Sequence, residues 1–235
     1  PHPGYGAPPV TERNGVWTTD FKGQFRTTDT RLCYPLTVCD AWSRFLIRCY
    51  ALPGPTTAGT IAVFQRASRE YGLPARIRSD NGEPFAAASL GRLSRLSVWW
   101  IRLGIYPELI APGSPQQNGA HERMHRTLKA ETTRPPAPNL AAQQQRFRVF
   151  RSRYNEERPH EALGQRPPAH LYTASPRELP ARVEPMVYPG HYEIRRVHQP
   201  GVMSWHSRRI VISTVLIGEE IGLAPIDDGE WDLHF

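Results

Sequence analysis

The chain has 235 residues, a hydrophobic content of 39% and a formal net charge of +7. No apolar run approaches the roughly 18 residues that span a bilayer, which argues against a membrane-spanning protein. The three cysteines form no CxxC pair and no signal peptide opens the chain, which argues against a secreted disulfide scaffold and predicts reduced thiols in an intracellular protein.

The first half of the chain predicts an antiparallel start to a sheet, followed by alternating helices and strands. Residues 1–14 are rich in Pro and Gly and are interpreted as a linker. The apolar patterns and turn residues predict strands at 16–21, 32–39, 44–52, 75–79 and 105–110, and helices at 56–71 and 90–103. The string APGSPQQNG at 111–119 predicts a mobile loop, which leads into a helix that bears Glu122, and a last helix covers 140–158.

The remainder of the chain differs in composition and charge. Residues 159–186 are rich in Pro and predict a semi-rigid linker that packs along the core. Residues 187–235 alternate apolar and polar side chains in short runs, which predicts a small β-barrel. Residues 184–235 hold eight acids against four arginines, a net of −4, which leaves +11 for residues 1–183. We therefore expect a polyanionic partner to contact the first part of the chain.

The strand order predicts where three acidic residues meet. A parallel crossover is right-handed and sequential strands tend to be neighbours, so the fourth strand can lie beside the first. That arrangement places Asp20, in the first strand, next to Asp80, at the end of the fourth. Glu122 follows on a helix that starts near Asn118. Together these carboxylates predict a site for Mg²⁺ or Mn²⁺, which prefer hard oxygen ligands.

Each acid also has a structural interpretation. Asp80-Asn81-Gly82 is a turn sequence, Asp20 could be a polar residue of an edge strand, and Glu122 could be a solvated acid in a first helical turn. Asp40 is expected to bond the backbone of its own turn with Ser43, and Glu83, beside Pro84, is expected in a turn.

One face of the helix after Asn118 carries basic residues. Steps of three and four residues place His125, Arg126 and Lys129 on the same side as Glu122, so they are candidates for contacting DNA. His121 lies on a different face and is interpreted as structural. Four tryptophans are interpreted as core or interface residues: Trp17, Trp42, Trp99 and Trp100.

At these residues the chain resembles the DDE transposase and retroviral-integrase superfamily, specifically bacterial insertion-sequence transposases with an integrase-type core. The matching strings are WTTDFKGQF, VCDAWSRFLI, IRSDNGEPF, APGSPQQNGAHERMHRTLKAE and YNEERPHEALGQRPPAHLY, within residues 15–173. The resemblance implies that Asp20, Asp80 and Glu122 bind two Mg²⁺ ions, for which Mn²⁺ can substitute. It also implies that Asn118, Arg126 and Lys129 approach DNA.

The expected architecture is therefore an α/β fold in four parts. Residues 15–158 form a ribonuclease-H-like core with a five-stranded mixed sheet flanked by helices, between the linkers at 1–14 and 159–186, and residues 187–235 form the barrel. The chain starts with Pro and lacks the helix-turn-helix region that such proteins carry, which predicts a fragment.

The expected function is metal-dependent 3′-end cleavage and strand transfer by a transposase. Its partners would be element-end and target DNA and at least one further copy of the chain, in the bacterial cytoplasm at the nucleoid. Two alternatives stay open. One is a ribonuclease-H-like nuclease or resolvase, and the other is a domesticated DNA-binding protein without catalysis.

Overall fold

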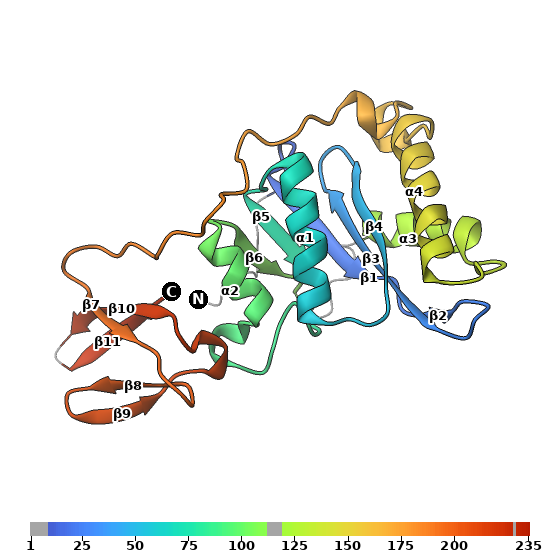
Figure 1. Ribbon diagram of the computed structural model, residues 1–235. Helices are drawn as coiled ribbons and strands as arrows, with labels where there is room; N and C mark the ends of the chain where they lie inside the picture. Colours follow the sequence, from blue (N-terminus) through green and yellow to red (C-terminus); the bar gives the residue numbers. More distant parts are fainter. Residues whose placement is uncertain (1–8, 112–118, 228) are drawn as a thin grey trace.

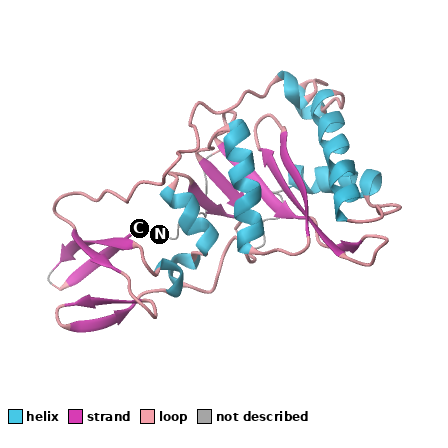
Figure 2. Ribbon diagram, in the orientation of Figure 1, coloured by secondary structure: helices cyan, strands magenta, loops and turns pink. Residues whose placement is uncertain are grey.

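The computed structural model describes residues 9–111, 119–227 and 229–235. It shows a mixed sheet flanked by helices, with a group of shorter strands at one end of the molecule (Figures 1 and 2). Asn118 and all but the two ends of the predicted 111–119 loop lie outside the described residues.

The large sheet contains the five predicted strands and one more. Its strands are β1 (Val16–Phe21), β2 (Phe25–Arg26), β3 (Leu32–Asp40), β4 (Leu46–Leu52), β5 (Arg76–Ser79) and β6 (Tyr106–Leu109). β1 pairs antiparallel with β3 and parallel with β5, β3 also pairs with β4, and β5 pairs parallel with β6. The predicted neighbourhood of the first and fourth strands is therefore confirmed. β2 was not predicted because it pairs only two residues with β3.

Local capping residues define the helices α1 (Thr57–Tyr71), α2 (Arg95–Arg102), α3 (Gly119–Thr132) and α4 (Leu140–Glu156). Thr56 and Asn139 cap α1 and α4 through backbone N–H groups of their first turns. Ser94 and Ser97 form a reciprocal capping box, so α2 starts later than the predicted residue 90. Residues Leu90–Arg92 form a separate short 3₁₀ turn.

Two apolar clusters place two helices on each face of the sheet. One cluster joins α1 and α2 to the sheet through residues such as Phe64, Trp100 and Ile77. The other joins α3 and α4 to it through Leu128, Phe147 and several small side chains of β3 and β4. Because side chains alternate along a strand, residues of β1 and β3 face the two helix pairs in turn. Asp20 lies on the α3 face.

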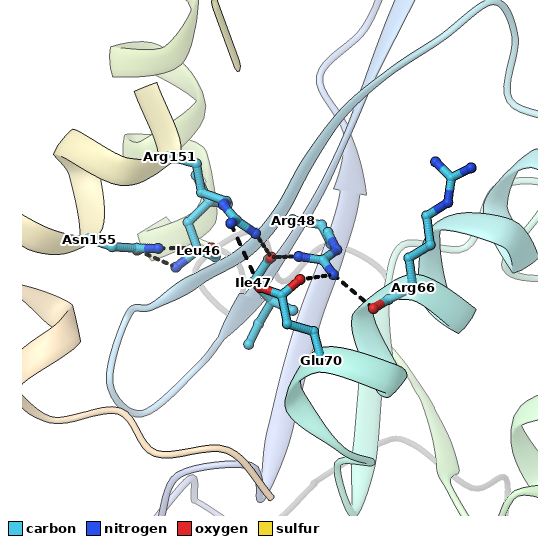
Figure 3. Close-up of polar contacts among 7 residues, drawn as sticks. All are labelled: Leu46, Ile47, Arg48, Arg66, Glu70, Arg151 and Asn155. Carbon is cyan, nitrogen blue, oxygen red and sulfur yellow. Dashed lines mark hydrogen bonds and ion pairs between the residues drawn. The ribbon is translucent and has the colours of Figure 1, made fainter. Parts of the chain in front are cut away.

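Side chains of α4 and α1 cover the edge strand β4 (Figure 3). The amide of Asn155 accepts from the Leu46 N–H at 2.8 Å and donates to the Leu46 carbonyl at 3.1 Å, and Arg151 donates to the Ile47 carbonyl at 2.9 Å. From the other side, Arg48 pairs with Glu70 of α1 at 2.5 Å. The bonds from Asn155 and Arg151 satisfy backbone groups that an open edge would offer to another chain.

The segment after α4 runs back over the core to the last strands (Figure 1). The Tyr172 ring stacks on Phe45 with centroids 4.2 Å apart, and the Arg177 side chain donates to the Pro74 carbonyl at 2.8 Å. Gly72 ends α1 with φ of 72°, and a Cβ there would lie 2.4 Å from the Ser175 carbonyl oxygen. The close contact of this segment with the helix end therefore requires glycine.

The C-terminal strands form two small sheets. β7 (Glu193–Arg196), β10 (Glu220–Asp227) and β11 (Glu230–His234) form one, and β8 (Val202–Trp205) and β9 (Arg208–Val211) form the other. Within the described residues no strand pairing closes the two sheets on each other, so the predicted barrel is not confirmed. Both sheets contribute to an apolar cluster that includes Val98 of α2.

The covering of β4 leads to a stability prediction. Asn155→Ala leaves the N–H and carbonyl of Leu46 without their side-chain partner in a buried position, so we expect unfolding to require about 2–3 kcal/mol less free energy. Urea denaturation followed by circular dichroism measures this loss. Gln145→Ala, on the exposed side of the same helix, is the control and should change stability by less than about 0.5 kcal/mol. Equal effects of the two substitutions would contradict the role of Asn155.

Candidate active site

Asp20 is the most buried of the three predicted ligands, with a side chain 21% exposed. Burial raises the pKa of its carboxyl group to about 7, and the negative charges of Asp80 and, to a smaller extent, Glu122 act in the same direction. The Phe21 backbone N–H and the charge of Lys22 oppose these effects only in part. The three acids therefore interact electrostatically, and the interaction makes ionisation of the Asp20 carboxyl group less favourable.

Asp80 reaches Asp20 because of the pairing between β1 and β5. Thr18 lies opposite Arg78 in this parallel pair, and Asp20 and Asp80 each follow two residues later at the same end of the two strands, where the charge of Asp80 acts on Asp20. Asp80 is exposed. One of its carboxylate oxygens, Oδ1, accepts from the Gly82 N–H at 3.1 Å, so the turn interpretation of this sequence is also correct.

Glu122 lies exposed in the first turn of α3. Its charge has a smaller effect on the pKa of Asp20 than that of Asp80. Among the described residues, no three His, Cys, Asp or Glu side chains are grouped as ligands of one ion. The three carboxylates would thus meet at one ion only after a side chain or the helix moves.

These residues fit a divalent metal by their chemistry and charge. Three carboxylates supply hard oxygen ligands of the kind that Mg²⁺ takes. The raised pKa of Asp20 shows that this site disfavours a third negative charge, which a bound cation would offset. Asp20, Asp80 and Glu122 are therefore the residues that would hold the ions.

His125 does not belong to the exposed stripe on α3, which corrects our prediction that it contacts DNA. Its side chain is buried, and Nδ1 lies 3.6 Å from Asp20 Oδ2. Burial lowers the pKa of the imidazole to about 2, so the ring is neutral and this contact is not an ion pair. The steps of three and four residues place His125 near Glu122 but do not show which part of the face the sheet covers. His121 is buried as well, as its structural interpretation requires.

Arg126 and Lys129 are exposed on α3, as a DNA-contacting role requires. Lys129 lines a cavity of about 170 Å³ together with Lys22, the residue two positions after Asp20. Lys22 was not identified from the sequence as a candidate, although its adjacency to Asp20 was the available signal.

A second group of basic residues was also missed. Arg44, Arg78 and Arg123 line a pocket of about 400 Å³ next to His121, with Trp42 on its rim. Trp42 is 37% exposed, so it is not a core residue. Arg44 and Arg123 have no carboxylate partner among the described residues, whereas Arg78 pairs with Glu108. Arg44 and Arg123 are 79 positions apart, and no sequence signal joins them.

The remaining acids have structural roles. Asp40 is fully buried and accepts from the Ser43 N–H at 2.8 Å and the Ser43 hydroxyl at 2.6 Å, as expected for an Asx-type turn. Glu83 lies in a turn before Pro84. Trp17 and Trp100 belong to the core, and Trp99 packs against it.

Two family models described as "Integrase core domain" match this chain, one over residues 10–115 and the other over residues 103–168. Both include parts of the acid cluster, and together they span the large sheet and its helices. The chain belongs to the DDE transposase and retroviral-integrase superfamily.

Its relatives and structural neighbours agree with this family. The chain is 28% identical over 182 residues to an uncharacterised protein of insertion element IS476 from Xanthomonas euvesicatoria, covering 77% of this chain and 50% of that protein. It is 28% identical over 160 residues to one of insertion element IS407 from Burkholderia multivorans, covering 67% of this chain and 55% of that protein. The chain thus spans about half the length of these relatives.

Solved structures show the fold. The magnesium complex of the HTLV-2 integrase catalytic core domain aligns with a TM-score of 0.54 and 17% identity, over 69% of this chain and 98% of that chain. A chain of the simian T-cell lymphotropic virus intasome aligns with a TM-score of 0.59 and 18% identity, over 100% of this chain and 80% of that chain. The core is therefore ribonuclease-H-like, as predicted.

No helix among the described residues is long and apolar enough to cross a membrane.

The raised pKa of Asp20 predicts a pH-dependent effect on stability. The folded-state pKa of about 7 exceeds the ordinary 3.8, so the unfolded chain loses this proton first as pH rises. The resulting penalty is absent below pH 3.8 and complete above pH 7. Asp20→Asn should therefore stabilise the metal-free protein at pH 8 by roughly 2–4 kcal/mol and have little effect near pH 4. Urea denaturation at both values measures this, with exposed Glu156→Gln as control. A pH-independent effect would contradict the assignment.

Proposed function

We propose that this chain is the catalytic part of a DNA transposase, which cleaves the 3′ ends of a mobile element and joins them to target DNA. The observation that carries the proposal is the electrostatic interaction of Asp20 with Asp80 and Glu122 within an integrase core. The order of the three acids supports it, as does their placement on a strand, directly after the neighbouring strand and on a helix. The family membership supports it as well.

Asp20, Asp80 and Glu122 would hold two Mg²⁺ ions, and Mn²⁺ could replace them. Bound ions supply Lewis-acid stabilisation of the attacking and leaving oxygens of a phosphodiester. Water first breaks the bond that frees a 3′-OH at the element end. That hydroxyl oxygen then forms a bond to a target phosphorus while the target's own 3′ oxygen leaves.

The chain's other residues bind and orient the DNA in this proposal. Arg126 and Lys129 are exposed on the helix that carries Glu122, and the charge of Lys22 acts on Asp20, so these side chains would hold the phosphate backbone near the acids. Asn118 is a further proposed contact on the sequence resemblance alone.

A covalent protein intermediate is not part of this mechanism. The three cysteines are buried, and burial raises the pKa of the Cys33 thiol to about 12, so it is not a thiolate nucleophile near neutral pH. Direct transfer between phosphodiesters fits the available side chains.

Assembly and location belong to the same proposal. Joining two element ends to one target requires two acid clusters at a fixed separation, so we propose at least a dimer on DNA, most simply with two-fold symmetry. The C-terminal sheets, which share one apolar cluster, would form a barrel-like appendage to the core. A cytoplasmic, nucleoid-associated location follows from DNA as the substrate, and a fluorescent fusion that stays away from the nucleoid would contradict it.

Two alternatives make different predictions. A nuclease or resolvase on the same fold would cleave DNA without joining it. A domesticated DNA-binding protein would bind the ends and do neither, and its function would survive loss of the acids.

A strand-transfer assay with labelled element-end DNA tests the proposal. We expect Mg²⁺-dependent joining that EDTA abolishes. Asp20→Asn, Asp80→Asn and Glu122→Gln should each reduce it by at least about 1,000-fold, because a metal ligand is lost, while DNA binding stays within about threefold. Light scattering of the complex with paired ends should show at least two chains.

Each outcome separates the alternatives. Cleavage without joining would favour the nuclease, and normal activity in any acid variant would remove that residue from the site. Concerted joining of two ends by a complex that contains one chain would refute the proposed assembly.

The basic residues of α3 yield a separate prediction about binding. Replacing Arg126 and Lys129 together by Gln should weaken DNA binding and reduce the slope of log Kd against log salt by about 2, since each contact contributes about 0.9. Fluorescence anisotropy over a salt series measures the slope. Replacing Arg69 and Arg95 by Gln removes the same charge from exposed positions on α1 and α2, on the other face of the sheet. Equal slopes for the two double variants would contradict a specific contact.

A further inference from the structure

We propose that Thr37 is a positioning residue, whose hydroxyl group fixes the helix of Glu122 relative to the strand of Asp20. The inference rests on the proposed function, since it concerns how the acids come to share an ion. Thr37 is on β3 and is fully buried, and it is not proposed as a ligand of the ions. It would act only through the groups that it holds.

Thr37 is bonded to the strand that carries Asp20. The two residues lie opposite each other in the antiparallel pair of β1 and β3. The Thr37 hydroxyl donates to the Asp20 carbonyl at 3.2 Å. Its side chain is therefore the closest cross-strand neighbour of Asp20 on the face that α3 covers.

The same hydroxyl contacts two imidazoles of α3. The Nε2 atoms of His121 and His125 each lie 2.6 Å from Thr37 Oγ1. The two rings are edge to face, with centroids 4.6 Å apart, so both can reach one oxygen atom. These histidines are four positions apart, and one of them directly precedes Glu122. Because one oxygen atom is bonded to side chains of two successive helical turns, these bonds limit both the rotation of α3 and its movement along its axis.

Counting protons gives the direction of each bond. The hydroxyl has one proton and two lone pairs, and a carbonyl oxygen can only accept. All three contacts are satisfied when the hydroxyl donates to Asp20 and each Nε2–H donates to the hydroxyl. His121 Nδ1 is then an acceptor, and the Thr18 hydroxyl donates to it at 2.9 Å in preference to the Cys39 carbonyl, which lies 3.4 Å from the same hydroxyl. Serine at position 37 can make all three bonds, whereas valine, of similar shape, can make none.

A purely structural role would be shared by other buried threonines. Thr19 provides the comparison, since it is 1% exposed and its hydroxyl donates to the Thr37 carbonyl at 3.0 Å. Among the described residues, its hydroxyl is bonded to this backbone carbonyl alone and to neither histidine. Thr19→Val therefore removes one buried hydroxyl without touching the contact with α3.

Mn²⁺ binding to the full chain without DNA tests the inference. The probe is the metal alone, followed by electron paramagnetic resonance of the free ion. We expect Thr37→Val to raise the Kd for Mn²⁺ by about 10–100-fold, as is usual when a residue that orients metal ligands is lost. Thr37→Ser and Thr19→Val should stay within about threefold of the unsubstituted chain. Near-ultraviolet circular dichroism checks that each variant is folded.

The outcomes distinguish this inference from the proposed function. If the unsubstituted chain binds Mn²⁺ and Thr37→Val binds it equally well, the positioning role is overturned while the metal site stands. If the unsubstituted chain does not bind Mn²⁺ at millimolar concentration, both proposals are overturned.

A measurement on the unsubstituted chain applies if Thr37→Val fails to fold. Proton NMR should then show a slowly exchanging Thr37 hydroxyl proton with cross-peaks to the Hε1 protons of both His121 and His125. Absence of either cross-peak would overturn the inference.

Discussion

The parallel pairing of β5 with β1 is the contact on which the site depends. It joins the first strand, which carries Asp20, to the strand that Asp80 directly follows. A slip of one residue would turn one acid to the other face of the sheet. Residues before β1 hold this register. The Asn14 carbonyl accepts from the Ala75 N–H at 2.9 Å, and the Asn14 N–H donates to buried Asp40 at 2.6 Å. Asp40, which is not a ligand, thus helps to place the two acids that are proposed as ligands.

The electrostatic environment of Asp20 is unfavourable for its charge, whereas polar groups elsewhere in the sheet have favourable partners. Burial and two neighbouring carboxylates oppose ionisation of Asp20. Buried Glu108 of β6, by contrast, is paired: it bonds Arg76 and Arg78 of β5, which ties the second parallel pair of strands together. Polar side chains of α4 likewise complete the exposed edge of β4. Sites that bind cations or substrates commonly hold charged groups whose ionisation is unfavourable until the ligand binds.

The sequence was sufficient to predict most of the large sheet, because its strands and helices differ in period and are bounded by Gly, Pro and capping residues. The neighbourhood of Asp20 and Asp80 followed from the handedness of crossovers. What failed depends on tertiary contacts. Burial of His125 depends on where Thr37 of another strand lies, and a two-residue strand such as β2 has no period. The pocket lined by Arg44 and Arg123 joins distant parts of the chain, and alternation in the C-terminal strands does not determine how they pair.

We propose that Asp20, Asp80 and Glu122 form one divalent metal site that is assembled only when metal and DNA bind. Anomalous X-ray diffraction from crystals grown with Mn²⁺ and element-end DNA would locate the ions directly. We expect anomalous density between the Asp20 and Asp80 carboxylates, with Glu122 brought to within ligand distance of about 2.1–2.2 Å of an ion. Density at a site that includes neither Asp20 nor Asp80, or an occupied site from which Glu122 stays remote, would contradict it.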